Sequence, residues 1–150
     1  MKAKIEFSDL DLQRAFAAMD PKTFKTTVKA GMRRSLNIIK KRVVANYKAA
    51  YPGSDRFKAI HAKVYRTGMG AMIDLIFLKG DKELRPWVLR FQNKGATARV
   101  TRKGGYNRGD MPASEFFSSA VEATKGQAES TLARNVDEAI VKKARKEGLV

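Results

Sequence analysis

One face of a single long helix is the feature of this sequence that most constrains its fold. Asp20 suits the N-cap of a helix and Pro21 its first position, where the missing N–H of proline would be unpaired anyway. Pro52-Gly53 ends the pattern. The sequence therefore predicts a helix over residues 21–50, about 45 Å long. Apolar residues recur along it at three- and four-residue spacing and form one stripe: Phe24, Val28, Met32, Leu36, Ile39, Val43 and Tyr47.

The charges on this helix are all positive. It holds nine Lys and Arg side chains, and no acidic residue occurs between Asp20 and Asp55. Like charges four residues apart destabilise an isolated helix by about 0.2–0.5 kcal/mol per pair, so packing of the apolar stripe must outweigh the repulsion. A solvated face is the usual explanation of a charge run, but so long a stretch without an acid favours a face turned towards an anionic partner. The candidate contact residues are Lys22, Lys25, Lys29, Arg33, Arg34, Lys40, Lys41 and Arg42.

The overall charge indicates the same kind of partner. Thirty-one Lys and Arg against fifteen Asp and Glu give a net charge of +16, which attracts polyanions. Nucleic acid fits such a surface, and so does an acidic protein. The absence of cysteine excludes disulfides and thiolate metal sites, and the single histidine, His61, cannot make a zinc site alone. No apolar run approaches the ~20 residues of a membrane span, and the first residues lack the apolar core of a signal peptide. We therefore expect an intracellular protein with no membrane partner.

Weaker alternation of apolar and polar residues predicts a sheet. Short turns at residues 67–70 and 79–82 favour an antiparallel meander. In the last predicted strand Trp87, Leu89 and Phe91 alternate with polar or smaller side chains. The predicted strands cover residues 2–7, 59–66, 71–78 and 84–91, and a short helix is expected over 9–19.

A second long helix is predicted near the end of the chain. Ser114 and Glu115 suit its first turn and Gly148 its stop, and Gly126 is expected to bend it or to mark a close contact. With 150 residues, the chain is expected to form one domain, 1–150. The predicted fold class is α+β: an antiparallel sheet of three to four strands with two long amphipathic helices packed on one face. The apolar positions of the second helix include Phe117, Val121, Thr124, Ala128 and Leu132.

The segment between the last strand and this helix is rich in glycine and basic residues. We expect a mobile basic loop at about residues 93–109, which is long for a connection without structure of its own. It contains neither GxxxxGK[ST] nor GxGxxG, so a phosphate-binding motif is not indicated. Its cations could follow a phosphate backbone while its tyrosine stacks on a base, or it could be a flexible surface loop. The candidate contact residues are Lys94, Arg99, Arg102, Lys103, Tyr106 and Arg108.

Catalytic chemistry finds little support in the sequence. No serine sits in a nucleophile elbow that could use His61, and Asp74, inside an apolar strand, is expected to face outward or to pair with a lysine. We predict no catalytic residue, no cofactor and no metal, and thus a protein that is not an enzyme. A metal-free ribonuclease of the small toxin type is a weaker alternative.

The order of these features resembles the phage minor tail proteins of the tail-completion, or head-tail joining, family. MKAKIEFSDLDLQRAFAAM resembles the family's opening strand and short helix, and NIIKKRVVANYKAAYPGSDRFKAI its long basic helix ending at a proline. VLRFQNKGATARVTRKG resembles the family's third strand running into a glycine-rich basic loop. MPASEFFSSAVEAT resembles the proline and phenylalanine segment that begins the C-terminal helix. The resemblance covers roughly residues 1–147.

This resemblance implies a structural function in a virion or prophage. It implies rings of identical subunits, with hexamers among the candidates, that join the tail to tail-tube or head-connector proteins while DNA passes through the centre. The expected location is the virion tail, and the host cytoplasm during assembly. In that setting the 93–109 loop would be disordered in the lone subunit and would order against a neighbouring subunit or DNA. The alternative function is a nucleic-acid-binding module that uses the 21–50 helix and the same loop.

Overall fold

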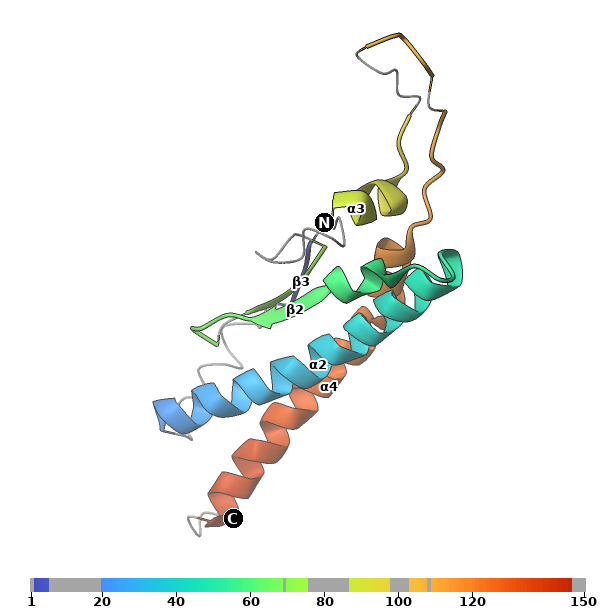
Figure 1. Ribbon diagram of the computed structural model, residues 1–150. Coiled ribbons are helices and arrows are strands. Elements are labelled where there is room, and N and C mark those ends of the chain that lie inside the picture. Colours follow the sequence, from blue (N-terminus) through green and yellow to red (C-terminus); the bar gives the residue numbers. More distant parts are fainter. Residues whose placement is uncertain are drawn as a thin grey trace.

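The computed structural model describes residues 2–5, 20–68, 70–75, 87–97, 103–107 and 109–146. Its elements combine helices with an antiparallel sheet, so the α+β class is confirmed, and most of the described residues are helical (Figure 1). No described helix has both the length and the apolar character needed to cross a membrane. In chain order the elements are β1 (Lys2–Ile5), α2 (Pro21–Ala50), the 3-10 helix η1 (Asp55–Ala59), β2 (His61–Val64), β3 (Ala71–Asp74), α3 (Trp87–Lys94) and α4 (Phe116–Lys146). The helix predicted over residues 9–19 lies outside the described residues.

Helix α2 begins and ends where the sequence predicts. The Asp20 carboxylate accepts hydrogen bonds from the backbone N–H groups of Lys22 and Thr23, both at 3.1 Å, so it caps the helix as expected. At the other end the Tyr51 N–H donates to the Tyr47 carbonyl at 2.8 Å. All seven residues of the predicted apolar stripe are at most 2% exposed. The amphipathic pattern therefore located the face of α2 that enters the core.

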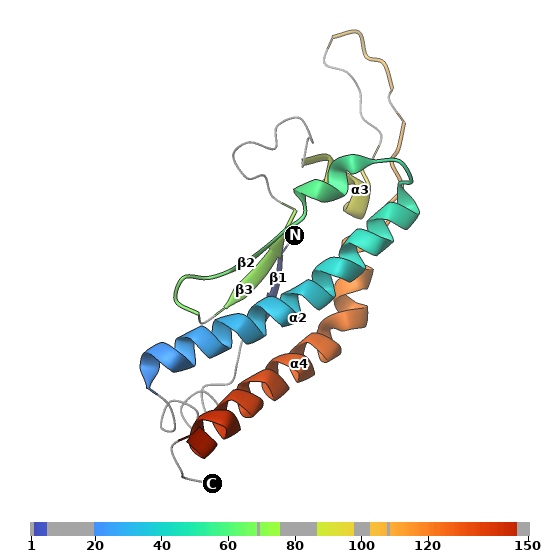
Figure 2. The ribbon, with the colours of Figure 1, turned by 60° about the horizontal axis from the view of Figure 1, so that its bottom comes forward.

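The sheet lies against α2. Its strands are antiparallel in the order β1-β3-β2, and β2 pairs with β3 from His61↔Asp74 at one end to Val64↔Ala71 at the turn. Ala71 and Ile73 of β3 are buried, as is Leu75 after it, whereas Asp74 is half-exposed. Figures 1 and 2 both show the β2–β3 hairpin beside α2. The strand predicted over 71–78 continues to residues 76–78, which lie outside the described residues.

The strand predicted over residues 84–91 is wrong from Trp87 onward, because Trp87–Lys94 is the helix α3. Its buried side chains are Leu89, Gln92 and Asn93, which have the i, i+3, i+4 spacing of one helical face. Two of these three side chains are polar amides, so the apolar pattern of the sequence does not show this helical face. Trp87 and Phe91 alternate with Leu89 in sequence, but both are exposed.

Helix α4 packs along α2 (Figure 2). It begins at Phe116, so Ser114 and Glu115 precede it instead of forming its first turn, and Glu115 has a positive φ of 49°. Phe117, Thr124, Ala128 and Leu132 are buried as expected, together with Phe116 and Ala120. Phe116 contacts α2, where its ring lies 5.0 Å from that of Tyr47. The stop predicted at Gly148 lies outside the described residues.

The two long helices pack closely against each other at Gly31. A Cβ on this buried glycine would lie 3.1 Å from Leu132 Cδ1 and 3.5 Å from Asn135 Cβ. Gly126, where a close contact was one expectation, is exposed, and no described atom lies within 4 Å of where its Cβ would be. The buried residues of α2, β3, α3 and α4 form one cluster. The prediction of one domain over 1–150 also covers residues that the structure does not describe, and it stays a prediction.

The two helical glycines predict opposite effects of substitution. Gly126→Ala should raise the free energy of unfolding by about 1 kcal/mol, because alanine stabilises an open helical position. Gly31→Leu should lower it by about 1–3 kcal/mol, because the side chain would force α2 and α4 apart. Urea unfolding followed by circular dichroism measures both changes. A Gly31→Leu protein as stable as the wild type would contradict the helix contact.

Ser35 predicts a stabilising change. Its hydroxyl is fully buried and has no hydrogen-bond partner among the described residues. Ser35→Ala removes this desolvated hydroxyl and adds a better helix former, so the free energy of unfolding should rise by about 1 kcal/mol. The exposed Ser130 of α4, changed to alanine, is the control for helix propensity, and this change also removes a solvent-exposed hydrogen bond of 3.1 Å to the Gln127 carbonyl. An equal gain in both variants would show that the buried hydroxyl carries no penalty.

Candidate functional site

The end of α3 holds the start of α4 through the side chain of Asn93 and the backbone carbonyl of Gln92. The Asn93 side-chain oxygen accepts from the Phe117 N–H at 2.7 Å, and its side-chain nitrogen donates to Ser118 Oγ at 3.2 Å. The Gln92 carbonyl accepts from the Ser114 N–H at 3.0 Å and from its hydroxyl at 2.6 Å. Asn93 thus satisfies one of the N–H groups that a helix start leaves unpaired. We call this network of Gln92, Asn93, Ser114, Phe117 and Ser118 the α3–α4 clamp.

The end of α2 supports the clamp. The Tyr47 hydroxyl donates to Gln92 Oε1 at 3.2 Å and lies 2.8 Å from Ser54 Oγ, and the Tyr51 hydroxyl donates to the Gln92 carbonyl at 3.3 Å. Asn46 Nδ2 donates to the Phe116 carbonyl at 3.3 Å. Residues of α2, α3 and α4 therefore all contribute hydrogen bonds that hold the clamp.

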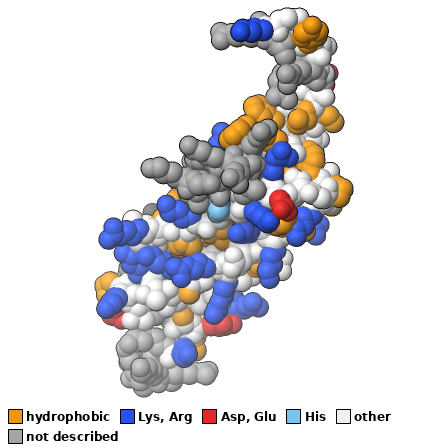
Figure 3. Space-filling view, viewed as in Figure 1, with side chains coloured by type: hydrophobic (Ala, Val, Ile, Leu, Met, Phe, Trp, Pro, Cys, Tyr) orange, Lys and Arg blue, Asp and Glu red, His pale blue; other side chains and the backbone are white. Residues whose placement is uncertain are grey.

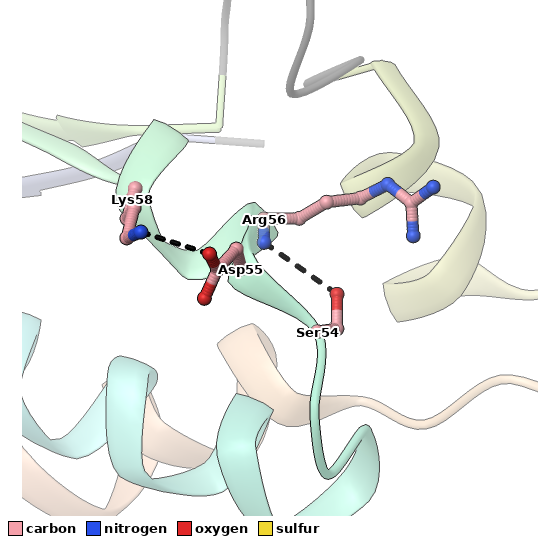
Figure 4. A network of polar contacts seen from close by, with 4 residues as sticks. All are labelled: Ser54, Asp55, Arg56 and Lys58. Atoms are coloured by element: carbon pink, nitrogen blue, oxygen red, sulfur yellow. Dashed lines mark hydrogen bonds and ion pairs between the residues drawn. The ribbon is translucent and has the colours of Figure 1, made fainter.

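The 3-10 helix η1 places an acid near this end of α2. Figure 4 shows the Ser54 hydroxyl accepting from the Arg56 N–H at 3.5 Å, and Lys58 Nζ 2.8 Å from Asp55 Oδ2. Asp55 is the first acid after Asp20 in the sequence, and it pairs within its own short helix. The described structure therefore does not turn it towards the cations of α2.

A long arm leaves the body directly after the clamp. Its root is an antiparallel bridge in which Ala96 and Met111 exchange two backbone hydrogen bonds of 2.9 Å. Gly95 before it has a φ of 74°, and a Cβ there would lie 2.7 Å from the Met111 carbonyl oxygen, so only glycine fits. We define the arm by the described residues between these two bridge positions, 96–97, 103–107 and 109–111. Figures 1 and 2 both show residues 103–107 extending away from the helices and the sheet.

The arm corrects the predicted start of the basic loop. The loop was expected from residue 93, but Asn93 is buried in α3 and Lys94 ends that helix. Lys94 is exposed beside the root, and Lys103 and Tyr106 are exposed in the arm, Tyr106 to 75%. Arg99, Arg102 and Arg108 lie outside the described residues. The mobility of the loop stays a prediction.

An apolar surface lies beside the arm root. Trp87 and Phe91 are 51% and 42% exposed, and they share one face of α3 with the exposed Arg90 and Lys94. We call these four residues the α3 face. An open groove of about 710 Å³ continues it, lined by Phe91, Lys94, Gly95, Ala96, Thr97, Asp110, Met111 and Ala113. In Figure 3 hydrophobic side chains gather at the base of the arm.

The fold divides the predicted cations of α2 into two groups. The first lies on the side of the β2–β3 hairpin, where a Cβ on Gly68 would lie 3.2 Å from Lys25 Cγ and 3.5 Å from Lys29 Cγ. Its members recur at helical spacing of three, four, four and seven residues. We call them the α2 row: Lys22, Lys25, Lys29, Arg33 and Lys40.

The second group lies on other sides of the helix. Arg34 reaches α4, where its Nη1 donates to Asn135 Oδ1 at 2.6 Å, and Lys41 and Arg42 are exposed. Figure 3 shows a band of Lys and Arg side chains over α2 with few acids among them. The described part of the arm extends away from this band, so Lys103 and Tyr106 do not form one continuous site with the cations of α2 (Figures 1 and 2).

Two cations of the hairpin were missed by the sequence analysis. Lys63 of β2 and Arg66 of the turn are exposed, and this turn is the one whose Gly68 contacts Lys25 and Lys29. Neither residue belongs to a charge run in the sequence. The turn brings Arg66 to the α2 row, whereas Lys63 lies opposite Met72, on the other face of the sheet from the buried Ala71 and Ile73. The two buried amides were missed for a related reason, since the partners of their side chains, the Phe117 N–H and the Tyr47 hydroxyl, lie on other helices.

The described residues contain no group of three or more His, Cys, Asp or Glu side chains placed to hold a metal ion. His61 is a half-buried residue of β2, and Asp74 stands opposite it across the strand pair. No family model matches the chain, and neither a curated protein nor a solved structure is similar to it.

The clamp predicts a large effect from one amide. Asn93→Ala removes the acceptor for the buried Phe117 N–H and should lower the free energy of unfolding by about 1–3 kcal/mol. Asn37→Ala, at an exposed position of α2, is the matched control and should change it by less than about 0.5 kcal/mol. Guanidinium unfolding measures both variants. Equal, small effects would mean that the clamp does not stabilise α4.

Proposed function

We propose that the chain is a structural, non-enzymatic component of a phage or prophage tail. It would be a ring-forming tail-completion or head-tail joining protein that links the tail to the capsid connector around the DNA channel. The observation that carries this proposal is the α3 face with its groove, an exposed apolar surface at the root of a protruding arm. The order of sequence features that resembles the tail-completion family supports it.

The composition of the α3 face is suited to contact with protein. Tryptophan, phenylalanine, methionine and arginine are enriched in interfaces, and an exposed apolar patch marks an interaction site more often than it marks free surface. The α3–α4 clamp fixes α3 and the arm root in one arrangement. A surface that is already ordered loses less conformational entropy when a partner binds.

The arm supports the same function. Its described residues extend from the body, and the Tyr106 side chain is 75% exposed, so it can become buried only on another molecule. A chain of net charge +16 repels its own copies unless an anion lies between them. DNA in the channel of a ring, or an acidic connector protein, would supply that anion. The proposed partners are further copies of the chain and tail-tube or head-connector proteins, in the virion tail and, during assembly, in the host cytoplasm.

The finer details of the predicted fold belong to this proposal. They are a sheet of three to four strands and the packing of both long helices on one of its faces, as the amphipathic patterns of the sequence predict. The described contacts of α4 are mainly with α2, and those of α2 are also with β2 and β3.

A nucleic-acid-binding module is the second candidate function. The nine cations of α2, without a single acid on that helix, favour it. The two functions differ in what each requires. A joining protein requires contact between subunits or with a tail component, whereas a binding module can act as a monomer.

Assembly is the expected behaviour of a joining protein. The full chain should elute as a multi-subunit species in size-exclusion chromatography with light scattering, alone or mixed with tail-tube protein. Trp87 is the only tryptophan, so burial of the α3 face should shift the fluorescence emission to shorter wavelength on assembly. The double variant Trp87→Ser, Phe91→Ser should remain monomeric, because it removes the apolar contact.

Val141→Ser is the control for this experiment, since Val141 is 45% exposed on α4, outside the α3 face and its groove. It should assemble like the wild type. A wild-type chain that stays monomeric with and without tail-tube protein would contradict the proposed function.

A further inference from the structure

We infer that the α2 row, together with Arg66 of the β2–β3 turn, is a contact surface for the phosphate backbone of duplex DNA. The inference deepens the second candidate function by naming the ligand and the face that binds it. It does not depend on whether the chain forms a ring. It also separates this surface from the arm, which the sequence had placed in the same site.

The geometry of the row suits a straight ligand. From Lys22 to Lys40 the helix rises about 27 Å, at 1.5 Å per residue. A strand of duplex DNA presents one phosphate per 3.4 Å of its axis, so about eight phosphates span that length. Helix α2 is held in the core from Phe24 to Tyr47, which keeps the row in line along its whole length. The duplex is equally stiff over this distance, so neither partner has to be reshaped on contact.

The charge of the row is uncompensated. Among the described residues none of its five cations forms an ion pair, and α2 contains no acid. The nearest acids in sequence are engaged elsewhere, because Asp20 caps the helix and Asp55 pairs with Lys58. On the hairpin, Asp74 stands at the end of β3 opposite to the turn that contacts the row. Among the described residues of α2 and the turn, a phosphate approaching the row from the turn side therefore meets cations alone.

Packing prepares two of these cations. The aliphatic stems of Lys25 and Lys29 lie against Gly68 of the hairpin turn, in van der Waals contact with the position of its missing Cβ. Long basic side chains commonly bury their stems in this way while the charged heads stay in water. Stems that already rest on the turn lose less side-chain entropy when the heads meet phosphate.

The observations favour duplex over single-stranded nucleic acid. Proteins that bind single strands combine cations with aromatic side chains on which unpaired bases stack. The large hydrophobic side chains that are exposed in the described structure are Trp87, Phe91, Tyr106 and Val141, and none of them lies on α2 or the hairpin. A surface of cations without aromatic platforms matches the backbone of a duplex, which carries no exposed base faces.

A matched pair of triple variants tests the inference. The row variant is Lys22→Gln, Lys25→Gln, Arg33→Gln, and the α4 control is Lys125→Gln, Lys142→Gln, Arg134→Gln. All six side chains are exposed, and each variant removes two lysines and one arginine, which lowers the net charge from +16 to +13. Binding of the full chain to a labelled 30-base-pair duplex is followed by fluorescence anisotropy from low to high salt.

The row variant should lower the slope of log affinity against log salt by about 2.7, since each lost phosphate contact removes about 0.9. At 150 mM salt this corresponds to binding weaker by about a hundredfold. The α4 control should leave the slope within about 0.5 of the wild type. A turn variant, Arg66→Gln, should lower it by about 0.9.

Three results would overturn the inference: equal losses in the row variant and the α4 control, no measurable duplex binding at 50 mM salt, or tighter binding to a single strand of the same length than to the duplex. Light scattering on the same samples measures the oligomeric state, so a failure of DNA binding can be told apart from a failure of the proposed assembly. The row variant should keep the assembly state of the wild type, because the α3 face is unchanged.

Discussion

Burial of the apolar stripe of α2 is the interaction on which the rest of the structure depends. The helix carries nine cations and no acid, so its own electrostatics oppose its formation. Full burial of one large apolar side chain contributes about 1.5–3 kcal/mol, whereas a like-charge pair on a helix costs about 0.2–0.5 kcal/mol. Seven buried residues therefore decide the balance, and the charges are tolerated as long as the stripe stays covered. The sheet and α4 cover this stripe, and the clamp holds the start of α4.

The kind of side chain that each helix buries explains why α2 could be predicted from the sequence and α3 could not. The stripe of α2 is made of apolar residues, and its cap and stop are residues with strong local preferences, so pattern and structure coincide. In α3 two of the three buried side chains are amides, Gln92 and Asn93. The Asn93 side chain accepts from the Phe117 N–H, and the Gln92 side chain accepts from the Tyr47 hydroxyl. Both partners lie more than twenty residues away in the sequence, so no local pattern reveals these bonds.

The residues of the candidate surfaces could be predicted from the sequence only in part, because their arrangement depends on the fold. The cations of α2 could be named from the sequence, but their division into a row facing the hairpin and a group facing elsewhere required the position of β2 and β3. Arg66 joins the row only through the contact of its turn with α2 at Gly68. The apolar α3 face could not be found at all, because the strand prediction placed Trp87, Leu89 and Phe91 on one side and the helix exposes only two of them. Charge is readable from the sequence residue by residue, whereas a surface depends on the fold.

The root of the arm has a consequence for how such a protein can change over time. Ala96 and Met111 close the arm with their own backbone bonds, and Gly95 and the clamp hold the body side of that closure without using any residue beyond it. None of the described bonds that close the arm or hold the start of α4 uses a residue between Ala96 and Met111. Residues can therefore be added, lost or exchanged between these two positions without removing any of those bonds. A lineage of such proteins could acquire a new binding partner by replacing this one segment while keeping its scaffold.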